Sequence, residues 1–467
     1  MSWSREEILL ATGGEVIQEG GWALFGDVVT DSRKVEQRSV FIALKGEKFD
    51  GHAFQREAIR RGAGCLIIHK GPVVSNSRGA TVIQVRDTLK ALGDLAHYRR
   101  KRVAPKVLAI TGSNGKTTTK EMVAAILERA SLLGESLRRN ILKTEGNYNN
   151  LVGLPLTLLR LRGKERVAVL ELGTSRPGEI RRLTEIADPD IGLITCVAPA
   201  HLTGLGSLAG VAREKGELFR RMDPRGTAVV NLDDPWVRRL GAKFRGNKIT
   251  YGRNGTVTGD SCRVLGARGI EFTLRVGREQ GRIRLRFLGK HNLSNALGAA
   301  AMAYGLGANL EAVRRGLEAV RPLPMRMAVE RWRGIGIIND AYNANPASME
   351  AALKTLADIE GGREKIAVLG DMLELDRETQ KSHLRLGKQA ARYRIGRLYL
   401  LGEHATQVKE GALLGGMAEE RVVVGSDHRE LGGMLREQAR RGDWLLFKGS
   451  RGMNMEKVLA AFQEIGE

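Results

Sequence analysis

The segment Thr111–Thr118, TGSNGKTT, constrains the fold of this chain most, because it lies between the apolar run VLAI and a helical segment. Glycines let the backbone curl so that its N–H groups, and the N-terminus of the following helix, point at phosphate oxygens. The lysine adds a positive charge, and a threonine hydroxyl can bind Mg²⁺. The predicted phosphate-binding residues are Gly112, Ser113, Asn114, Gly115, Lys116, Thr117 and Thr118.

This segment departs from the general phosphate-loop pattern, because the first glycine of that pattern would fall at Ile110. A glycine-rich turn without a ligand is therefore the alternative. The order of strand, glycine turn and helix nevertheless predicts a parallel sheet covered by helices, with its ligand at the carboxyl ends of the strands.

The pattern of strand-like and helical runs divides the 467 residues into three parts, as a chain of this length suggests. We expect an α/β protein with a small mixed α/β N-terminal domain in residues 1–104. A central P-loop ATPase-like domain with a parallel sheet is predicted for residues 105–321. A C-terminal Rossmann-like domain follows in residues 322–467, where strands and helices alternate again.

The chain is strongly basic, with 75 lysines and arginines against 53 acidic residues and a net charge of +22. This charge favours anionic partners, among them nucleotides, acidic small molecules and nucleic acid. The basic residues are spread out, with only short clusters such as residues 99–102, and aromatic residues make up 5%. A solvated basic surface is the simpler interpretation, and we predict no nucleic-acid partner.

No apolar run approaches the ~20 residues of a membrane-spanning helix, so no membrane insertion is expected. The start of the chain lacks a basic region followed by an apolar one. The three cysteines show no metal-ligand or redox spacing, which is typical of free thiols in a reducing compartment. We therefore expect a cytoplasmic protein.

Two further residues stand where parallel strands are predicted to end. Glu171 closes the apolar strand VAVLEL and could hold Mg²⁺ opposite Thr117, although a capping or surface role is the alternative. His201 follows the run IGLITCVAPA, and a lone histidine in a loop is more often structural than a ligand.

Eight segments together resemble the Mur ligase family, in the same order and across essentially the whole chain. They are TGSNGKTTTKEM, GNYNNLVGLPLTLL, ELGTSRPGEI, PAHLTGLGSLAGVAREKGELF, GKHNLSNALGAAAMA, NDAYNANPASMEAAL, LGDMLEL and FKGSRGMNMEKV. The resemblance implies an ATP-dependent carbon–nitrogen ligase of peptidoglycan precursor synthesis that forms an acyl phosphate.

The run DAYNANP, residues 340–346, is the most specific part of this resemblance. It is similar to the corresponding segment of those Mur ligases that join D-alanyl-D-alanine to UDP-N-acetylmuramoyl-tripeptide. The members that add the third peptide residue carry an arginine-containing motif that this chain lacks. The resemblance therefore implies D-alanyl-D-alanine and the UDP-linked tripeptide as substrates, with ATP and Mg²⁺ as cofactors, and we expect a monomer.

The resemblance also assigns roles to residues that the chain's own pattern leaves open. It implies that Lys116, His201 and Lys215 are catalytic, and that Lys215 is carbamylated to become an anionic metal ligand, whereas the pattern alone suggests a helix-surface lysine. The implied metal ligands are Thr117, Glu171, His201 and Lys215. Further implied ATP contacts are His291, Asn292, Asn295, Arg326 and Asp340. The implied substrate contacts are Ser32 and Arg33 for the uridine diphosphate, and Asn343, Asn345, Lys448 and Arg451 on the dipeptide side.

One position departs from the usual sequence pattern of the family. Asp376 follows Leu-Glu-Leu where the family usually has glycine, so no ligand contact is carried to that position. Two alternatives remain: another amide ligase of the same fold, separable by a substrate panel, and a basic ATPase whose hydrolysis nucleic acid would stimulate.

Overall fold

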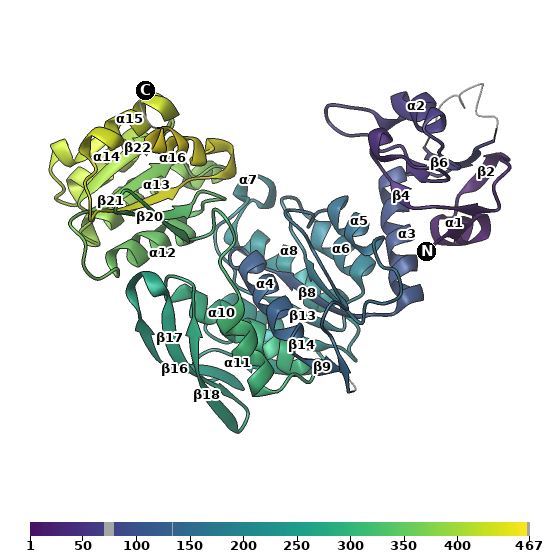
Figure 1. Cartoon of the computed structure of the whole chain (residues 1–467), viewed down its shortest axis with the longest axis horizontal. Helices are drawn as coiled ribbons and strands as arrows, with labels where there is room; N and C mark the ends of the chain where they lie inside the picture. The colour runs from purple at the N-terminus through teal and green to yellow at the C-terminus, as the bar shows by residue number, and fades with distance from the viewer. Residues whose placement is uncertain (70–78, 133, 465–467) are drawn as a thin grey trace.

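Three β-sheets, each covered by helices, follow one another along the chain in the computed structural model, which describes residues 1–69, 79–132 and 134–464. Figure 1 shows the N-terminal part and the C-terminal part on different sides of the central one. The predicted three-domain α/β fold is confirmed. Among the described residues, no helix combines the length and the apolar character needed to cross a membrane.

The N-terminal domain is built on a five-stranded sheet in which only the pairing of the first two strands is antiparallel. In spatial order its strands are β2 (Glu15–Gln18), β7 (Thr81–Gln84), β6 (Cys65–Ile68), β5 (Val40–Ile42) and β4 (Val28–Val29). Its helices are α1 (Arg5–Thr12), α2 (Gln55–Arg60) and α3 (Thr88–Val103). The combination of helices and strands agrees with the predicted mixed α/β domain.

The central domain contains a nine-stranded sheet that is parallel over its first seven strands and ends in an antiparallel meander. In spatial order its strands are β11 (Ile141–Lys143), β12 (Val167–Glu171), β8 (Lys106–Thr111), β13 (Ile191–Ile194), β14 (Thr227–Asn231), β15 (Asn247–Tyr251), β16 (Val257–Val264), β17 (Ile270–Val276) and β18 (Glu279–Leu285). Its helices are α4 (Lys116–Leu127), α5 (Gly153–Leu158), α6 (Glu179–Ala187), α7 (Leu202–Leu205), α8 (Leu208–Arg221), α9 (Pro235–Ala242), α10 (His291–Gly305) and α11 (Leu310–Ala319).

The apolar character of β8 follows from burial on both faces of this sheet. Val107 and Ala109 lie in the cluster that includes α5, α6 and α8, whereas Leu108 and Ile110 lie in the cluster of α4, α10 and α11. A strand covered by helices on both sides has no solvent face, so its sequence is continuously apolar rather than alternating.

The C-terminal domain has a six-stranded sheet that is parallel except for one edge strand. In spatial order its strands are β19 (Ala328–Trp332), β20 (Ile335–Asp340), β24 (Trp444–Lys448), β21 (Lys365–Gly370), β22 (Arg397–Leu401) and β23 (Val422–Val424). Its helices are α12 (Pro346–Ala357), α13 (Thr379–Arg392), α14 (Ala405–Leu414), α15 (His428–Gln438) and α16 (Glu456–Gln463). This topology confirms the Rossmann-like prediction.

The basic cluster at residues 99–102 differs from the predicted solvated surface. Arg99 and Arg100 are 1% and 8% exposed. Arg99 donates to the carbonyl of Leu161 at 3.1 Å, and Arg100 donates to that of Ala187 at 3.2 Å. Half of this cluster therefore anchors α3 to the central domain. The predicted domain limits at 104/105 and 321/322 stay predictions; they fall between α3 and β8, and between α11 and β19.

Candidate active site

The central domain contributes to the site through residues at the carboxyl ends of three adjacent strands. In the spatial order β12, β8, β13, Glu171 ends the first strand, the phosphate loop follows the second, and the segment leading to His201 follows the third. The C-terminal sheet turns its own carboxyl ends, Asp340 and Lys448, to the same cleft of about 610 Å³. Ligands of open α/β sheets bind at such edges.

The phosphate loop requires glycine at two positions. A Cβ on Gly112 would collide with Thr195 Oγ1, and one on Gly115, whose φ is 80°, would collide with Asn295 Oδ1. Among the described residues no side chain caps the N-terminus of α4. The first amides of that helix are therefore available to an anion, as the sequence predicted.

The Lys116 side chain is fixed within this loop. Its ammonium donates to the Gly112 carbonyl at 2.8 Å. Desolvation in the cleft lowers its pKa, and Glu171 opposes that shift. A cation held at a helix N-terminus can form charge-assisted hydrogen bonds to a phosphate group during its transfer.

Thr117 and Glu171 place a hydroxyl and a carboxylate side by side in the cleft. The Thr117 hydroxyl donates to Glu171 Oε2 at 2.7 Å, and Asn149 Nδ2 donates to Oε1 at 2.9 Å. Asn149 was not among the predicted site residues, because nothing in the segment GNYNNL distinguishes a functional asparagine from its neighbours.

The residues here fit Mg²⁺ better than a metal that needs a full protein cage. A hydroxyl and a carboxylate are hard oxygen donors. In the described ranges no three His, Cys, Asp or Glu side chains converge as a metal cluster. Mg²⁺ is commonly bound by one or two carboxylates together with phosphates and water, which agrees with this sparse donor set.

The His201 side chain contacts the C-terminal domain and not Glu171, with which it was predicted to share a metal. Its Nδ1 donates to Glu374 Oε2 at 2.5 Å, and the backbone N–H of Leu202 donates to the Glu374 carbonyl at 2.9 Å. His201 and Glu374 both have a positive φ, 54° and 61°. Burial lowers the pKa of His201, and the Glu374 carboxylate opposes that shift. Glu374 was missed because it lies 173 residues from His201 along the chain.

Lys215 is a buried lysine of α8, at 2% exposure, so the surface alternative is wrong. Burial lowers the pKa of its amine to about 7, and the Lys116 charge adds to this effect. The Lys215 side chain does not line the cleft itself.

An amide network borders the cleft beside the phosphate loop. Asn295 donates to Asn292 Oδ1 at 2.8 Å, and Asn292 donates to the Leu288 carbonyl at 2.7 Å. His291, at the start of α10, lines the same wall. The three predicted residues therefore lie together.

The C-terminal wall contains a buried ion pair. Asp340 and Lys448 are direct neighbours in the register of β20 and β24, and Lys448 Nζ lies 2.5 Å from Asp340 Oδ2. The same ammonium donates to the Asn343 carbonyl at 2.9 Å. Arg326 stacks on the Tyr342 ring with its guanidinium 3.8 Å from the ring centre.

Four of the predicted substrate-binding residues use their side chains in contacts with other residues of the protein, or lie outside the cleft. Asn345 lines the cleft but uses its side chain to bond Asn114 and to cap α12. Arg451 pairs with Glu456 at 2.7 Å and is outside the cleft lining. Ser32 and Arg33 belong to the N-terminal domain, where Ser32 donates to Glu57 and Arg33 pairs with Asp31.

The family models and known proteins agree with the three-domain fold. Residues 27–100 match the Mur ligase family catalytic domain, residues 110–303 the Mur ligase middle domain, and residues 325–451 the Mur ligase glutamate ligase domain. The UDP-N-acetylmuramoyl-tripeptide–D-alanyl-D-alanine ligase of Escherichia coli K12 is 36% identical over 94% of both chains.

Solved structures give the same result. MurF from Acinetobacter baumannii superposes with a TM-score of 0.90 at 32% identity, covering 100% of this chain and 99% of that one. MurF from Thermotoga maritima in complex with ADP has a TM-score of 0.82 at 27% identity, covering 94% and 97%. From its folded domains, its cleft and these relatives, the chain belongs to the Mur ligase family.

Proposed function

We propose that this protein joins D-alanyl-D-alanine to UDP-N-acetylmuramoyl-tripeptide, with conversion of ATP to ADP and phosphate. The observation that carries the proposal is the cleft in which the phosphate loop and Glu171 face Asn343 and Lys448 from the other sheet. The full-length similarity to ligases of that name supports it. The ADP complex of a related structure supports nucleotide binding in this fold.

The first step activates the carboxylate of the tripeptide. A carboxylate oxygen attacks the γ-phosphorus of ATP, the bond to the bridging oxygen breaks, and ADP leaves with that electron pair. Lys116 and the first amides of α4 are placed to stabilise the charge on the transferring group. Thr117 and Glu171 would hold Mg²⁺, which supplies neutralisation of phosphate charge when bound.

The second step forms the amide. The unprotonated amine of the dipeptide attacks the acyl carbon, phosphate leaves, and the nitrogen loses a proton. The Asn343 side chain and the Lys448 ammonium are placed on the wall where we expect the dipeptide. The contacts between His201 and Glu374 keep the two domains together around the intermediate, which protects an acyl phosphate from water.

Lys215 is proposed to carry a carbamate in the active enzyme. Only a neutral amine attacks CO₂, forming a nitrogen–carbon bond and releasing one proton. The lowered pKa of about 7 supplies that neutral amine near physiological pH. The carbamate is anionic and offers the oxygen ligands that Mg²⁺ prefers.

Carbamylation is testable apart from turnover. With ¹³C-bicarbonate, the wild type should show a carbamate resonance that Lys215→Ala lacks. The variant should be nearly inactive, and acetate should partly restore activity by occupying the vacated space. Normal activity of Lys215→Ala without bicarbonate or acetate would refute the carbamate.

Ser32 and Arg33 are proposed to hold the uridine diphosphate on the N-terminal domain. Arg33 is largely exposed, and its guanidinium is oriented by Asp31. The side-chain contact with Arg33 holds the pKa of Asp31 at about 2, so the pair is ionised throughout the neutral range. Replacing Arg33 with alanine should raise KM for the UDP-linked substrate while leaving that for ATP unchanged.

We propose that the protein acts as a monomer. The three cysteines, all within the described residues, are free thiols, which supports a cytoplasmic location.

A substrate panel tests the proposal as a whole. Phosphate release from ATP is measured with UDP-N-acetylmuramoyl-tripeptide and either D-alanyl-D-alanine or single amino acids. We expect release with the dipeptide only. Preference for a UDP-linked dipeptide plus a diamino acid would indicate the sibling ligase, and stimulation by DNA or RNA would indicate the nucleic-acid ATPase.

A further inference from the structure

Two asparagines form a reciprocal amide pair across the cleft. Asn345 Nδ2 donates to Asn114 Oδ1 at 2.8 Å, and Asn114 Nδ2 donates to Asn345 Oδ1 at 3.3 Å. Asn114 belongs to the phosphate loop, whereas Asn345 begins α12 of the C-terminal domain, 231 residues later. The pair is a direct polar contact between the nucleotide-binding loop and the other domain.

Further contacts hold the Asn345 side chain and the Asn114 backbone. Asn345 is 8% exposed, and its Oδ1 also accepts from the Ser348 N–H at 2.9 Å as the N-cap of α12. The backbone carbonyl of Asn114 accepts from the Thr195 hydroxyl at 2.6 Å. Any movement of the C-terminal domain away from the loop would therefore break both bonds of the pair together.

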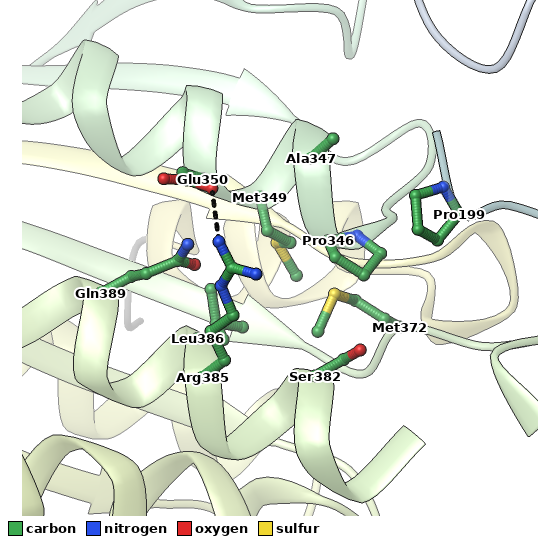
Figure 2. Close-up of a pocket in the computed structure, with 10 residues that line it drawn as sticks. All are labelled: Pro199, Pro346, Ala347, Met349, Glu350, Met372, Ser382, Arg385, Leu386 and Gln389. Atoms are coloured by element: carbon green, nitrogen blue, oxygen red, sulfur yellow. Dashed lines mark ion pairs between the residues drawn. The ribbon is translucent and has the colours of Figure 1, made fainter. Parts of the chain in front are cut away.

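Other directional contacts between these domains are made by His201 and Leu202 with Glu374, and the asparagine pair adds a contact at the phosphate loop itself. Figure 2 shows Pro199 of the central domain across a cavity from Pro346 and Met372 of the C-terminal domain. This cavity has a volume of about 170 Å³, and its lining includes Glu350 and Arg385 as well as apolar side chains.

We propose that the Asn114–Asn345 pair is a latch that couples the conformation of the phosphate loop to the position of the C-terminal domain. This inference rests on the proposed function. Arg326 and Asp340, the expected ATP contacts of the C-terminal domain, reach the cleft only from that domain, so a closed latch keeps their side chains facing the nucleotide. Asn345 then acts as a positioning residue. Loss of its hydrogen bonds to Asn114 lowers the affinity for nucleotide even when no dipeptide is bound.

A double-mutant cycle tests the latch by calorimetric binding of a non-hydrolysable ATP analogue. Asn345→Ser keeps an oxygen that can cap α12 but is too short to reach Asn114. We expect it to weaken analogue binding about tenfold, since two neutral hydrogen bonds are lost. In an Asn114→Ala or Asn114→Ser background, the same change should have no further effect.

Asn309→Ala is the matched control, because Asn309 caps α11 through the Ala312 N–H at 2.9 Å and contacts no other domain in the described interactions. It should leave analogue binding unchanged. An equal loss from Asn345→Ser in both backgrounds would overturn the latch. So would a rise in the KM for dipeptide without any change in analogue affinity.

These outcomes are distinct from failure of the proposed function. Analogue binding requires neither dipeptide nor ligation, so the cycle reports on the latch even if the substrate panel reveals another amine.

Discussion

The Lys116 ammonium bonds to the carbonyl of its own loop, so it is in place before any phosphate binds. Lys116→Ala should lower turnover about a thousandfold or more, because it removes a charge-assisted contact to a transferring group. Steady-state phosphate release measures this, with circular dichroism to confirm an unchanged fold. Lys106→Ala, at a surface lysine paired with Asp190, should behave as wild type. A Lys116 variant with a tenth of wild-type turnover would contradict the phosphate role.

Lys215 has an effect on stability that is separate from its chemistry. Burial disfavours its cation, so in CO₂-free buffer at pH 7 or below Lys215→Met should be more stable than wild type by about 1–3 kcal/mol. Between pH 7 and the ordinary lysine value of 10.5, the unfolded wild type binds more protons than the folded form, so its stability rises with pH. The difference should therefore shrink over that range in urea titrations. A constant difference from pH 6 to 10 would contradict a buried amine with a lowered pKa.

At the scale of elements, the loop between β21 and α13 holds Glu374 against His201, and its backbone is strained. Asp376 has a φ of 49°, in the left-handed region that glycine adopts without a steric penalty. This explains physically why glycine suits the position. Asp376→Gly should raise the free energy of unfolding by up to about 1 kcal/mol.

Chemical denaturation checks this, and Asp358→Gly is its control. Asp358 ends α12 with a φ of −73°, where glycine relieves no strain and adds flexibility to the unfolded chain. That change should be neutral or destabilising. Equal gains at both positions would show that strain at Asp376 is not the cause.

For the whole molecule, α3 ties the N-terminal domain to the central one through buried arginines. Arg100 donates to the carbonyls of Ala187 and Asp188 at 3.2 and 2.8 Å. Arg100→Leu should cost about 2 kcal/mol, because buried acceptors lose their donor. Lys101→Leu, which removes an exposed ion pair, should cost less than about 1 kcal/mol.

Limited proteolysis and calorimetry separate the two effects. In Arg100→Leu we expect earlier cleavage between residues 103 and 106 and a separate first transition on heating. Lys101→Leu should keep the wild-type pattern. If the two variants melt alike, the buried donors do not anchor the domain.

The sequence by itself determined the strand, glycine turn and helix of the phosphate loop, the three α/β domains, and the strand-end position of Glu171. These are local: periodicity sets element type, and parallel strands bring their carboxyl ends to one edge. Only the tertiary structure decided the partners of His201 and Asn345, the burial of Lys215 and the anchoring by Arg99 and Arg100. Each of these depends on a contact between residues far apart in the chain or on which helix face another element covers, and neither is encoded in local spacing.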